Sequence, residues 1–410
     1  MATILLAWEL GGGMGHLLPL RGIGEVLVKR GHRVIAAVRD LSRVGQLFAG
    51  SGIAFLQAPI YQGKRMAAGE RVSGFAHILA STCFGDDGVM GKLFEAWNDV
   101  LDQVKPDLLV ADHAPSALLA VRGKTIPCVN MGLAFCCPPD VSPLPYWWSS
   151  REESPAEEVA TFEESLLQRV NRLLENKGRP RLKRLSQLFN QIDDVVLATY
   201  RELDPYGDRA KGRYWGHWHV GSGVEPVWPE GAGPKIYAYL KPFPALEGLL
   251  NELRRMNCPA LVLSGGISLA LQARYASELL RFEERPLHMG QVAARCDVAI
   301  LNAGHGTMAS LLLAGKPLLL VPLYTEQLLN SQGVERLGAG RWVLPNERGR
   351  VGLMLEDVVS RESYREAAQG FAKRYAGFLP GQQLPALADR LEGLVGKKPR
   401  HCTAAAAAVS

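Results

Sequence analysis

The chain has 410 residues, of which 47% are hydrophobic and 21% charged, the balance of an ordinary soluble globular protein with room for two domains. The net charge of +5 is spread along the chain, and no RNP-like, zinc-finger or helix-turn-helix pattern occurs, so we expect no nucleic-acid partner. Seven irregularly spaced cysteines without a CxxC pair argue against a zinc site and favour reduced thiols.

The N-terminal half begins with an alternation of strand and helix. Residues 2–7 predict a strand, 11–15 a glycine-rich turn, 17–30 a helix that Gly31 ends, and 33–38 a second strand. These connections are short, so we expect a βαβ unit and a parallel sheet. Further strands are expected at 53–56, 107–111, 126–130 and 195–199.

The middle of the chain changes character twice. Residues 138–150 are rich in Pro, Trp and Ser and predict an irregular loop, whereas 154–190 follow a helical pattern with a break at 178–180. The stretch 221–234 has many Gly and Pro residues and few periodic apolar ones, so we interpret it as an interdomain linker.

A second α/β series follows the linker. Its strands are expected at 235–240, 260–264, 297–301, 318–321 and 341–343, with helices between them. The predicted domains are therefore residues 1–220 and 235–396, and the alanine-rich tail 397–410 is expected to be disordered. We find no basic n-region and no uninterrupted apolar run that could span a bilayer, because Lys316 interrupts the best candidate. We therefore expect a cytoplasmic protein without stable membrane insertion.

A histidine follows the first glycine-rich turn. The stretch from Gly11 to Pro19 reads GlyGlyGlyMetGlyHisLeuLeuPro and places His16 near the start of a helix, where the dipole disfavours the imidazolium. A neutral His16 could accept a proton from a substrate hydroxyl, or it could simply cap the turn. The stretch lacks the acidic residue of a dinucleotide fingerprint and the Gly-Lys-Ser/Thr of a P-loop.

Asp112 follows the strand expected at 107–111, at the carboxyl end of that strand. Its carboxylate could orient His16 and balance the charge of the imidazolium, as in a catalytic triad, or it could cap the helix near Pro115. In an extended chain the neighbouring His113 faces the opposite side, so we expect Asp112 rather than His113 to pair with His16.

The most specific pattern runs from Asn302 to Asn330. It reads strand, glycine-rich turn, helix, a Gly-x-Pro stop at 315–317, strand and a polar cluster. Backbone N–H groups at a helix start bind phosphate, and glycines let the phosphate come close. The polar cluster, which includes Glu326 and Gln327, follows the next strand, where open α/β sheets bind ligands. One part suits a diphosphate and the other a polyhydroxyl group, which together indicate a nucleotide-sugar.

These stretches resemble the signatures of GT-B glycosyltransferases, in particular the macrolide and antibiotic glycosyltransferases and the UDP-glycosyltransferases. GlyHisLeuLeuPro at 15–19 is similar to their GlyHisxxPro, which puts His16 at the general base and Asp112 at its partner. GluGln at 326–327 falls on the pair that binds sugar hydroxyls. The resemblance implies an α/β protein with two Rossmann-like, doubly wound parallel-sheet domains facing a cleft, the first for the acceptor and the second for the donor.

The donor site also departs from the family. Asn302 stands where the family has a diphosphate-contacting His, and Ser310 where it has a ribose-binding Glu. His305 could take over the phosphate contact, and Lys241 could meet a phosphate or remain solvated. The expected donor-binding residues are Asn302, Gly304, His305, Gly306, Thr307, Glu326, Gln327 and Asn330.

The sequence thus predicts an inverting, metal-independent glycosyltransferase that needs no cofactor beyond its nucleotide-diphosphate sugar substrate. Trp147, Trp148 and the helices at 154–190 suit a small hydrophobic acceptor. The alternatives are a lipid-linked acceptor, for which the basic residues between Arg169 and Arg184 could face a membrane, a nucleotide-sugar epimerase, and a degenerate binding or partner protein. The sequence predicts no oligomeric state.

Overall fold

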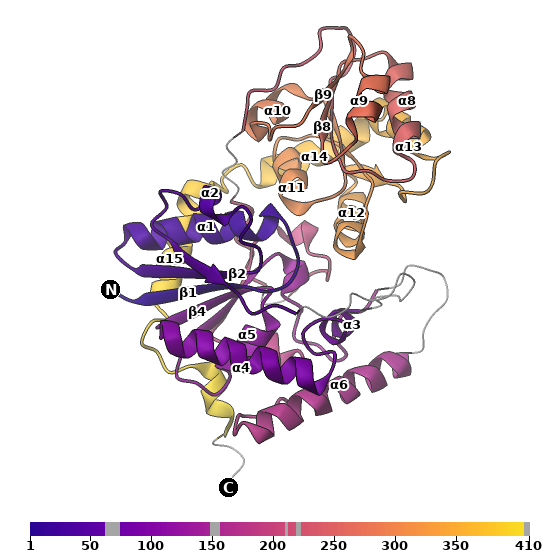
Figure 1. Ribbon diagram of the computed structural model, residues 1–410. Coiled ribbons are helices and arrows are strands. Elements are labelled where there is room, and N and C mark those ends of the chain that lie inside the picture. Colours follow the sequence, from indigo (N-terminus) through magenta and orange to yellow (C-terminus); the bar gives the residue numbers. More distant parts are fainter. Residues whose placement is uncertain (62–73, 148–155, 210–211, 219–222, 406–410) are drawn as a thin grey trace. The chain divides into compact units, whose positions relative to one another are not determined.

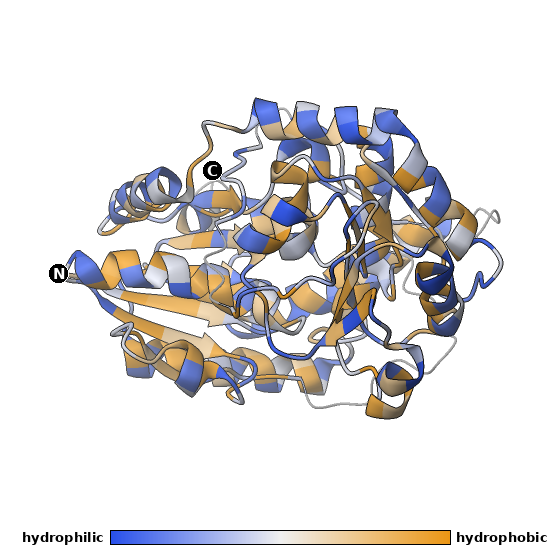
Figure 2. Ribbon diagram, turned by 90° about the horizontal axis from the view of Figure 1, so that it is seen from above, coloured by the Kyte–Doolittle hydropathy of each residue, from blue (hydrophilic) through white to orange (hydrophobic). Residues whose placement is uncertain are grey.

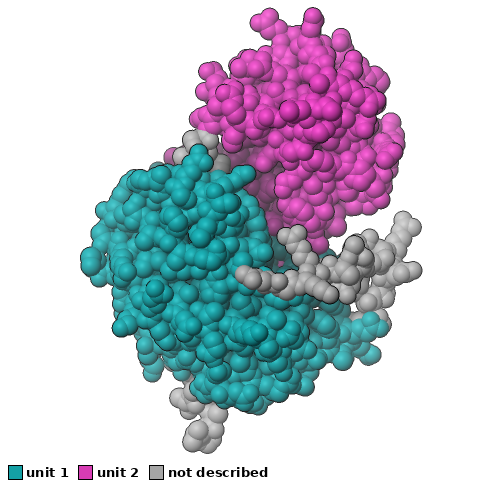
Figure 3. All heavy atoms as spheres, in the orientation of Figure 1, with its two compact units in different colours: residues 1–200, 208–218, 381–410 teal, residues 201–207, 219–380 magenta. Residues whose placement is uncertain are grey.

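The computed structural model describes the chain except for residues 62–73, 148–155, 210–211, 219–222 and 406–410. The chain forms two compact units, which Figure 3 draws in different colours. Unit 1 comprises residues 1–200, 208–218 and 381–410, and unit 2 comprises residues 201–207 and 219–380.

Unit 1 is built on a parallel sheet with the strand order β3-β2-β1-β4-β5-β6, of which Figure 1 labels β1, β2 and β4. Its strands are β1 (Thr3–Trp8), β2 (Arg33–Val38), β3 (Ala54–Gln57), β4 (Leu108–Asp112), β5 (Cys128–Gly132) and β6 (Asp194–Leu197). Its helices are α1 (Met14–Lys29), α2 (Val44–Leu47), α3 (Phe75–Ala80), α4 (Asp87–Val104), α5 (Pro115–Val121), α6 (Ala156–Asn176), α7 (Gln187–Asn190) and α15 (Pro380–Glu392), with short 3₁₀ turns η1 (Ala134–Cys136) and η3 (Arg400–Ala405).

Unit 2 repeats this plan with the order β12-β11-β10-β7-β8-β9, again all parallel. Its strands are β7 (Ile236–Leu240), β8 (Ala260–Ser264), β9 (Leu280–Glu283), β10 (Val298–Leu301), β11 (Leu318–Leu320) and β12 (Gly340–Trp342). Its helices are α8 (Leu246–Met256), α9 (Leu269–Tyr275), α10 (Met289–Arg295), α11 (His305–Leu313), α12 (Thr325–Leu337), α13 (Val351–Ser360) and α14 (Glu362–Arg374), and η2 (Arg201–Leu203) lies beside α12.

Both faces of each sheet are covered, which explains the apolar strands in Figure 2. In β1, Leu5 and Ala7 contribute to one apolar cluster, whereas Ile4 and Leu6 contribute to a second cluster on the opposite face. The two doubly wound parallel sheets confirm the expected fold class. None of the helices in the described part of the chain is both long and apolar enough to cross a membrane.

The C-terminal segment differs from the expected domain division. Residues 381–396 were assigned by sequence to the second domain, but α15 belongs to unit 1. Its buried Leu387 and Leu391 lie in the same apolar cluster as β1 residues, and Arg390 forms an ion pair with Asp194. The expected disordered tail also contains structure, because His401 in η3 is buried and its Nδ1 accepts a hydrogen bond from the backbone N–H of Gly123 at 3.3 Å.

Candidate active site

His16 and Asp112 lie against each other in unit 1. Asp112 is the last residue of β4 and pairs in register with Trp8, the last residue of β1. His16 lies in the first turn of α1, and its Nδ1 is 3.1 Å from both carboxylate oxygens of Asp112. Only 5% of the surface of His16 and 2% of that of Asp112 is exposed. The structure therefore brings together the two residues that the sequence pairs.

The surroundings of His16 fix the position of its ring. When Nδ1 carries the proton and donates it to Asp112, Nε2 is the basic atom. Gly11 has a φ of 81°, and a Cβ there would lie 2.5 Å from Nε2, so only glycine leaves room for the imidazole. The ring of Trp8 stacks on His16 with centroids 5.2 Å apart.

His113 also lies close to His16, which corrects the expectation that it would face away. The strand ends at Asp112, and His113 adopts a left-handed backbone with a φ of 46°. Its ring is stacked with that of His16 at a centroid distance of 6.0 Å. The side chain is buried, which lowers its pKa to about 3, and neither ring nitrogen has a hydrogen-bond partner among the described residues. The sequence carried only one signal for this residue, its position next to Asp112.

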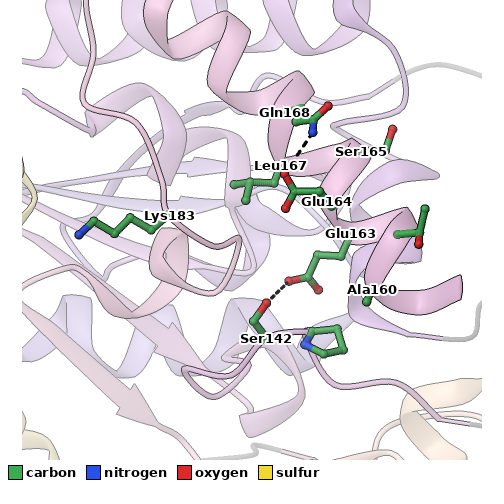
Figure 4. A pocket seen from close by; sticks show the side chains of 10 residues that line it. Ser142, Ala160, Glu163, Glu164, Ser165, Leu167, Gln168 and Lys183 are labelled. Carbon is green, nitrogen blue, oxygen red and sulfur yellow. Dashed lines mark hydrogen bonds between the residues drawn. The ribbon is translucent and has the colours of Figure 1, made fainter. Parts of the chain in front are cut away.

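The predicted acceptor residues are described only in part. Trp147 is half-buried and its ring lies 5.7 Å from that of Phe135, while Trp148 falls outside the described residues. The surface pocket shown in Figure 4 borders α6 and has a volume of about 610 Å³. Its Glu163 accepts hydrogen bonds from the Ser142 hydroxyl and from the backbone N–H of Leu144. This pocket includes neither Trp147 nor His16.

Five of the seven basic residues between Arg169 and Arg184 form ion pairs with acids of unit 1. Arg169 and Arg172 lie 3.5 Å from the carboxylate of Asp87. The remaining ion pairs are Lys177 with Glu95, Arg181 with Glu175 and Arg184 with Asp140. Most of this basic surface is therefore salt-bridged within unit 1.

In unit 2, the side chain of Asn302 forms hydrogen bonds that connect the ends of three strands. It follows β10, and its Oδ1 accepts a hydrogen bond from the backbone N–H of Lys241 at 2.7 Å. Its Nδ2 donates to the carbonyl of Val321 at 2.9 Å. The side chain is buried, and its amide is engaged with the backbone after β7 and β11. Asn302 thus holds the loop between β10 and α11 in place, and its expected contact with the diphosphate stays a prediction.

Two other residues predicted to bind the sugar donor also form hydrogen bonds with the backbone. Asn330 donates from Nδ2 to the carbonyl of Ala303 at 3.0 Å, and Ala303 has a left-handed φ of 57°. Gln327 accepts a hydrogen bond from the backbone N–H of Leu323 at 2.8 Å. Glu326, in the first turn of α12, is half-buried. The polar cluster therefore fixes the loops that follow β10 and β11, and Glu326 is its most exposed member.

The start of α11 is open to solvent at its N-cap. Gly304 is exposed with a φ of −65°, and a Cβ there would meet no atom within 4 Å. No side chain caps this helix, and its first turn holds no acidic residue. His305 is buried, which lowers its pKa to about 4. Gly306 and Thr307 are half-buried, and the Ser310 hydroxyl donates to the Gly306 carbonyl at 2.9 Å.

Comparison with known proteins identifies this part of unit 2. Residues 278–373 match the glycosyltransferase family 28 C-terminal domain. A PGL/p-HBAD biosynthesis rhamnosyltransferase from Mycobacterium bovis is 29% identical over 310 residues, which cover 69% of this chain and 67% of that protein. The solved structure of CalG4, the calicheamicin glycosyltransferase, aligns over 97% of this chain and 99% of its own with a TM-score of 0.70 and 18% identity.

The chain is a glycosyltransferase with the GT-B fold.

Two further proteins extend the comparison for this glycosyltransferase. A UDP-N-acetylglucosamine--N-acetylmuramyl-(pentapeptide) pyrophosphoryl-undecaprenol N-acetylglucosamine transferase from Rhodospirillum centenum is 26% identical over 370 residues, 84% of this chain and 82% of that protein. A Streptomyces sp. SF2575 glycosyltransferase, SsfS6, complexed with thymidine diphosphate, aligns over 95% of this chain and 100% of its own with a TM-score of 0.58 and 17% identity. The matched domain contains the loop after β10 and the start of α12, whereas His16 and Asp112 lie outside it.

Proposed function

We propose that this glycosyltransferase moves a sugar from a nucleotide-diphosphate donor to a hydroxyl of a small, hydrophobic acceptor, with inversion and without a metal ion. The buried contact between His16 and Asp112 carries the proposal. Nε2 of His16 takes the proton of the acceptor hydroxyl, whose oxygen forms a bond to the anomeric carbon. The bond from that carbon to the diphosphate breaks on the opposite face, and Asp112 stabilises the imidazolium that forms.

The start of α11 supports the assignment of the leaving group. No side chain caps this helix, and Gly304 is exposed there, which suits a diphosphate because backbone N–H groups and the helix dipole favour an anion at a helix start. Such preorganised donors stabilise the charge that develops as the diphosphate departs. Glu326 would accept hydrogen bonds from sugar hydroxyls. In this scheme unit 1 binds the acceptor and unit 2 the donor.

The relatives suggest which donor to test first. One is named a rhamnosyltransferase, and one solved structure of the same fold is described as complexed with thymidine diphosphate. We therefore take dTDP-rhamnose as the first donor and UDP-N-acetylglucosamine as the second. Cytoplasmic location remains a prediction from the sequence.

A lipid-linked acceptor is the second candidate function. The observation in its favour is the relative from Rhodospirillum centenum, whose name specifies an undecaprenol-linked acceptor. Arg169, Arg172 and Arg184 do not support a lipid-linked acceptor, because their guanidinium groups already form ion pairs with carboxylates. Turnover of a lipid-linked acceptor together with none of a panel of small alcohols and phenols would select this candidate.

Donor binding gives the first test. Thermal unfolding is measured with UDP, dTDP, GDP and their common sugars, because a ligand at a hundred times its Kd adds about 2.7 kcal/mol of stability. A rise in the unfolding temperature with one nucleotide and not with the others supports the proposal and identifies the nucleobase of the donor. The product formed with that donor is then examined by NMR for inverted anomeric configuration, with and without EDTA. Retained configuration or loss of turnover in EDTA would contradict the mechanism.

A further inference from the structure

We propose that His113 forms a hydrogen bond with the acceptor beside the hydroxyl that His16 deprotonates, and that the acceptor is therefore a vicinal diol. This inference rests on the proposed role of His16 as the base and names the acceptor class of the same site. His113 would be a binding residue that contacts the substrate without exchanging a proton with it.

The first argument is the convergence of the two rings on Gly11. The point that a Cβ on Gly11 would occupy lies 2.5 Å from Nε2 of His16 and 3.4 Å from Nδ1 of His113. The proposed basic atom and a nitrogen of the second ring thus border the same spot. The two oxygens of a vicinal diol lie close enough together for each to meet one of these nitrogens. A single isolated hydroxyl would engage only one of them.

The second argument is the cost of a histidine at this position. His113 is only 6% exposed, and neither of its ring nitrogens has a hydrogen-bond partner in the described chain. The rings of Phe75 and Phe135 lie 6.4 Å and 6.3 Å from its own, so a phenylalanine would suit the apolar surroundings better. Buried polar groups without partners destabilise a fold and are concentrated at functional sites, as are left-handed backbones of residues other than glycine.

The third argument is the charge of the ring. Burial lowers the pKa of His113 to about 3, so the imidazole is neutral at the pH at which His16 acts as a base. A neutral imidazole donates one hydrogen bond and accepts another, which matches a hydroxyl group and gives no charge pairing with a carboxylate or an amine. The same row of aromatic rings continues through Phe135 to Trp147, one of the predicted acceptor residues.

The test uses the full chain labelled with ¹⁵N in its histidine rings, with His16 and His113 signals assigned from the variants His16→Ala and His113→Phe. The probes are two matched pairs, catechol with phenol and cis-cyclohexane-1,2-diol with cyclohexanol. We expect the diols to shift the ring nitrogen signals of both histidines and the mono-ols to shift only that of His16. A response to catechol alone identifies an aromatic diol, and a response to the cyclohexane diol alone identifies an aliphatic one.

The opposite results are equally clear. A His113 signal that neither diol shifts, or that the mono-ols shift as much as the diols, overturns the inference. A His16 signal that no probe shifts instead contradicts the proposed base, so the two failures are distinguishable. As a second measurement, His113→Phe should weaken binding of the responding diol by about tenfold or more and leave the mono-ol unaffected, whereas His113→Asn, which keeps hydrogen-bonding groups, should weaken it less. Thermal unfolding confirms that both variants are folded.

Discussion

The backbone N–H of Lys241 donates a 2.7 Å hydrogen bond to Oδ1 of Asn302, and this contact ties the end of β7 to the end of β10. The same amide donates to Val321 beyond β11, so one side chain joins three neighbouring strand ends. The turn from Asn302 to Gly304 is thereby held at the start of α11. The residue that departs from the family pattern therefore holds the turn that leads into α11, where we propose that the diphosphate binds.

Asn302→Ala should destabilise unit 2 and weaken donor binding together. The substitution leaves the buried Val321 carbonyl and the partly buried Lys241 N–H without their partner, which costs about 1–3 kcal/mol. Urea unfolding measures the loss, and nucleotide titration measures the weaker binding. The control is Ser310→Ala, whose hydroxyl donates to the Gly306 carbonyl of its own helix and whose removal should change the free energy of unfolding by about 0.5 kcal/mol or less. Equal free energies of unfolding of the two variants would contradict the role of Asn302 in connecting the strand ends.

Gly304→Asp should raise stability while abolishing donor binding. Gly304 is an N-cap with open space around its α-carbon, so a carboxylate fits and accepts hydrogen bonds from the first turn of α11. Such a cap stabilises by about 0.5–1 kcal/mol, and its negative charge occupies the place proposed for the diphosphate. We expect the affinity for nucleotide to fall by about tenfold or more.

The matched control for the higher stability and lower nucleotide affinity of Gly304→Asp is Gly349→Asp. Gly349 is also an exposed glycine of unit 2 with open space around it. Its substitution should leave nucleotide affinity unchanged. A Gly304→Asp protein that binds nucleotide like the wild type would place the diphosphate elsewhere.

His16→Ala should lower kcat by about 10²–10⁴, the usual contribution of a general base, with little change in donor affinity. Asp112→Asn should also lower kcat, because an amide no longer stabilises the imidazolium or fixes its tautomer. The double variant should be about as slow as His16→Ala alone, since the two side chains act as a unit. The control is His32→Gln, a histidine that pairs with Glu392 in the same unit. Additive losses in the double variant would mean that Asp112 acts independently of His16.

The strands of both units were predictable because central parallel strands are continuous apolar runs. Residues 33–38 and 260–264 form strands at their expected bounds, and the others differ by one or two residues. The sequence does not predict the strand at 280–283, because this four-residue edge strand, LeuArgPheGlu, lacks the continuous apolar run of the central strands. Local pattern also does not reveal which unit receives the apolar face of α15, so its return to unit 1 was not predictable.

The candidate site also has parts that the sequence predicts and parts that it does not. The contact between His16 and Asp112 follows from a general rule, because carboxyl ends of parallel strands gather at one edge of a sheet. The position of His113 depends on a left-handed backbone, which is uncommon for residues other than glycine, so the extended-chain argument misplaced it. The amides of Asn302 and Asn330 were recognised as site residues, but their contacts with backbone depend on loop geometry that residue type does not specify.

Glu9→Gln should change how stability depends on pH. Glu9 follows β1 and is fully buried, which raises its pKa from 4.5 to about 7, although the backbone N–H of Ser116 donates a hydrogen bond to it. The folded protein therefore holds a proton between pH 4.5 and 7 that the unfolded chain has released, so stability from this group falls as pH rises through that window. The shift corresponds to about 3 kcal/mol.

Glutamine keeps an acceptor for Ser116 and cannot ionise, so we expect Glu9→Gln to gain up to about 3 kcal/mol relative to the wild type between pH 5 and pH 8. Urea unfolding of both proteins at several pH values measures the difference. The lowered pKa values of His113 and His305 destabilise the fold as pH falls below about 6.5, and they act equally in both proteins, so they cancel in the comparison. If the free energies of unfolding of the two proteins change in parallel with pH, Glu9 is ionised in the folded protein and the prediction is wrong.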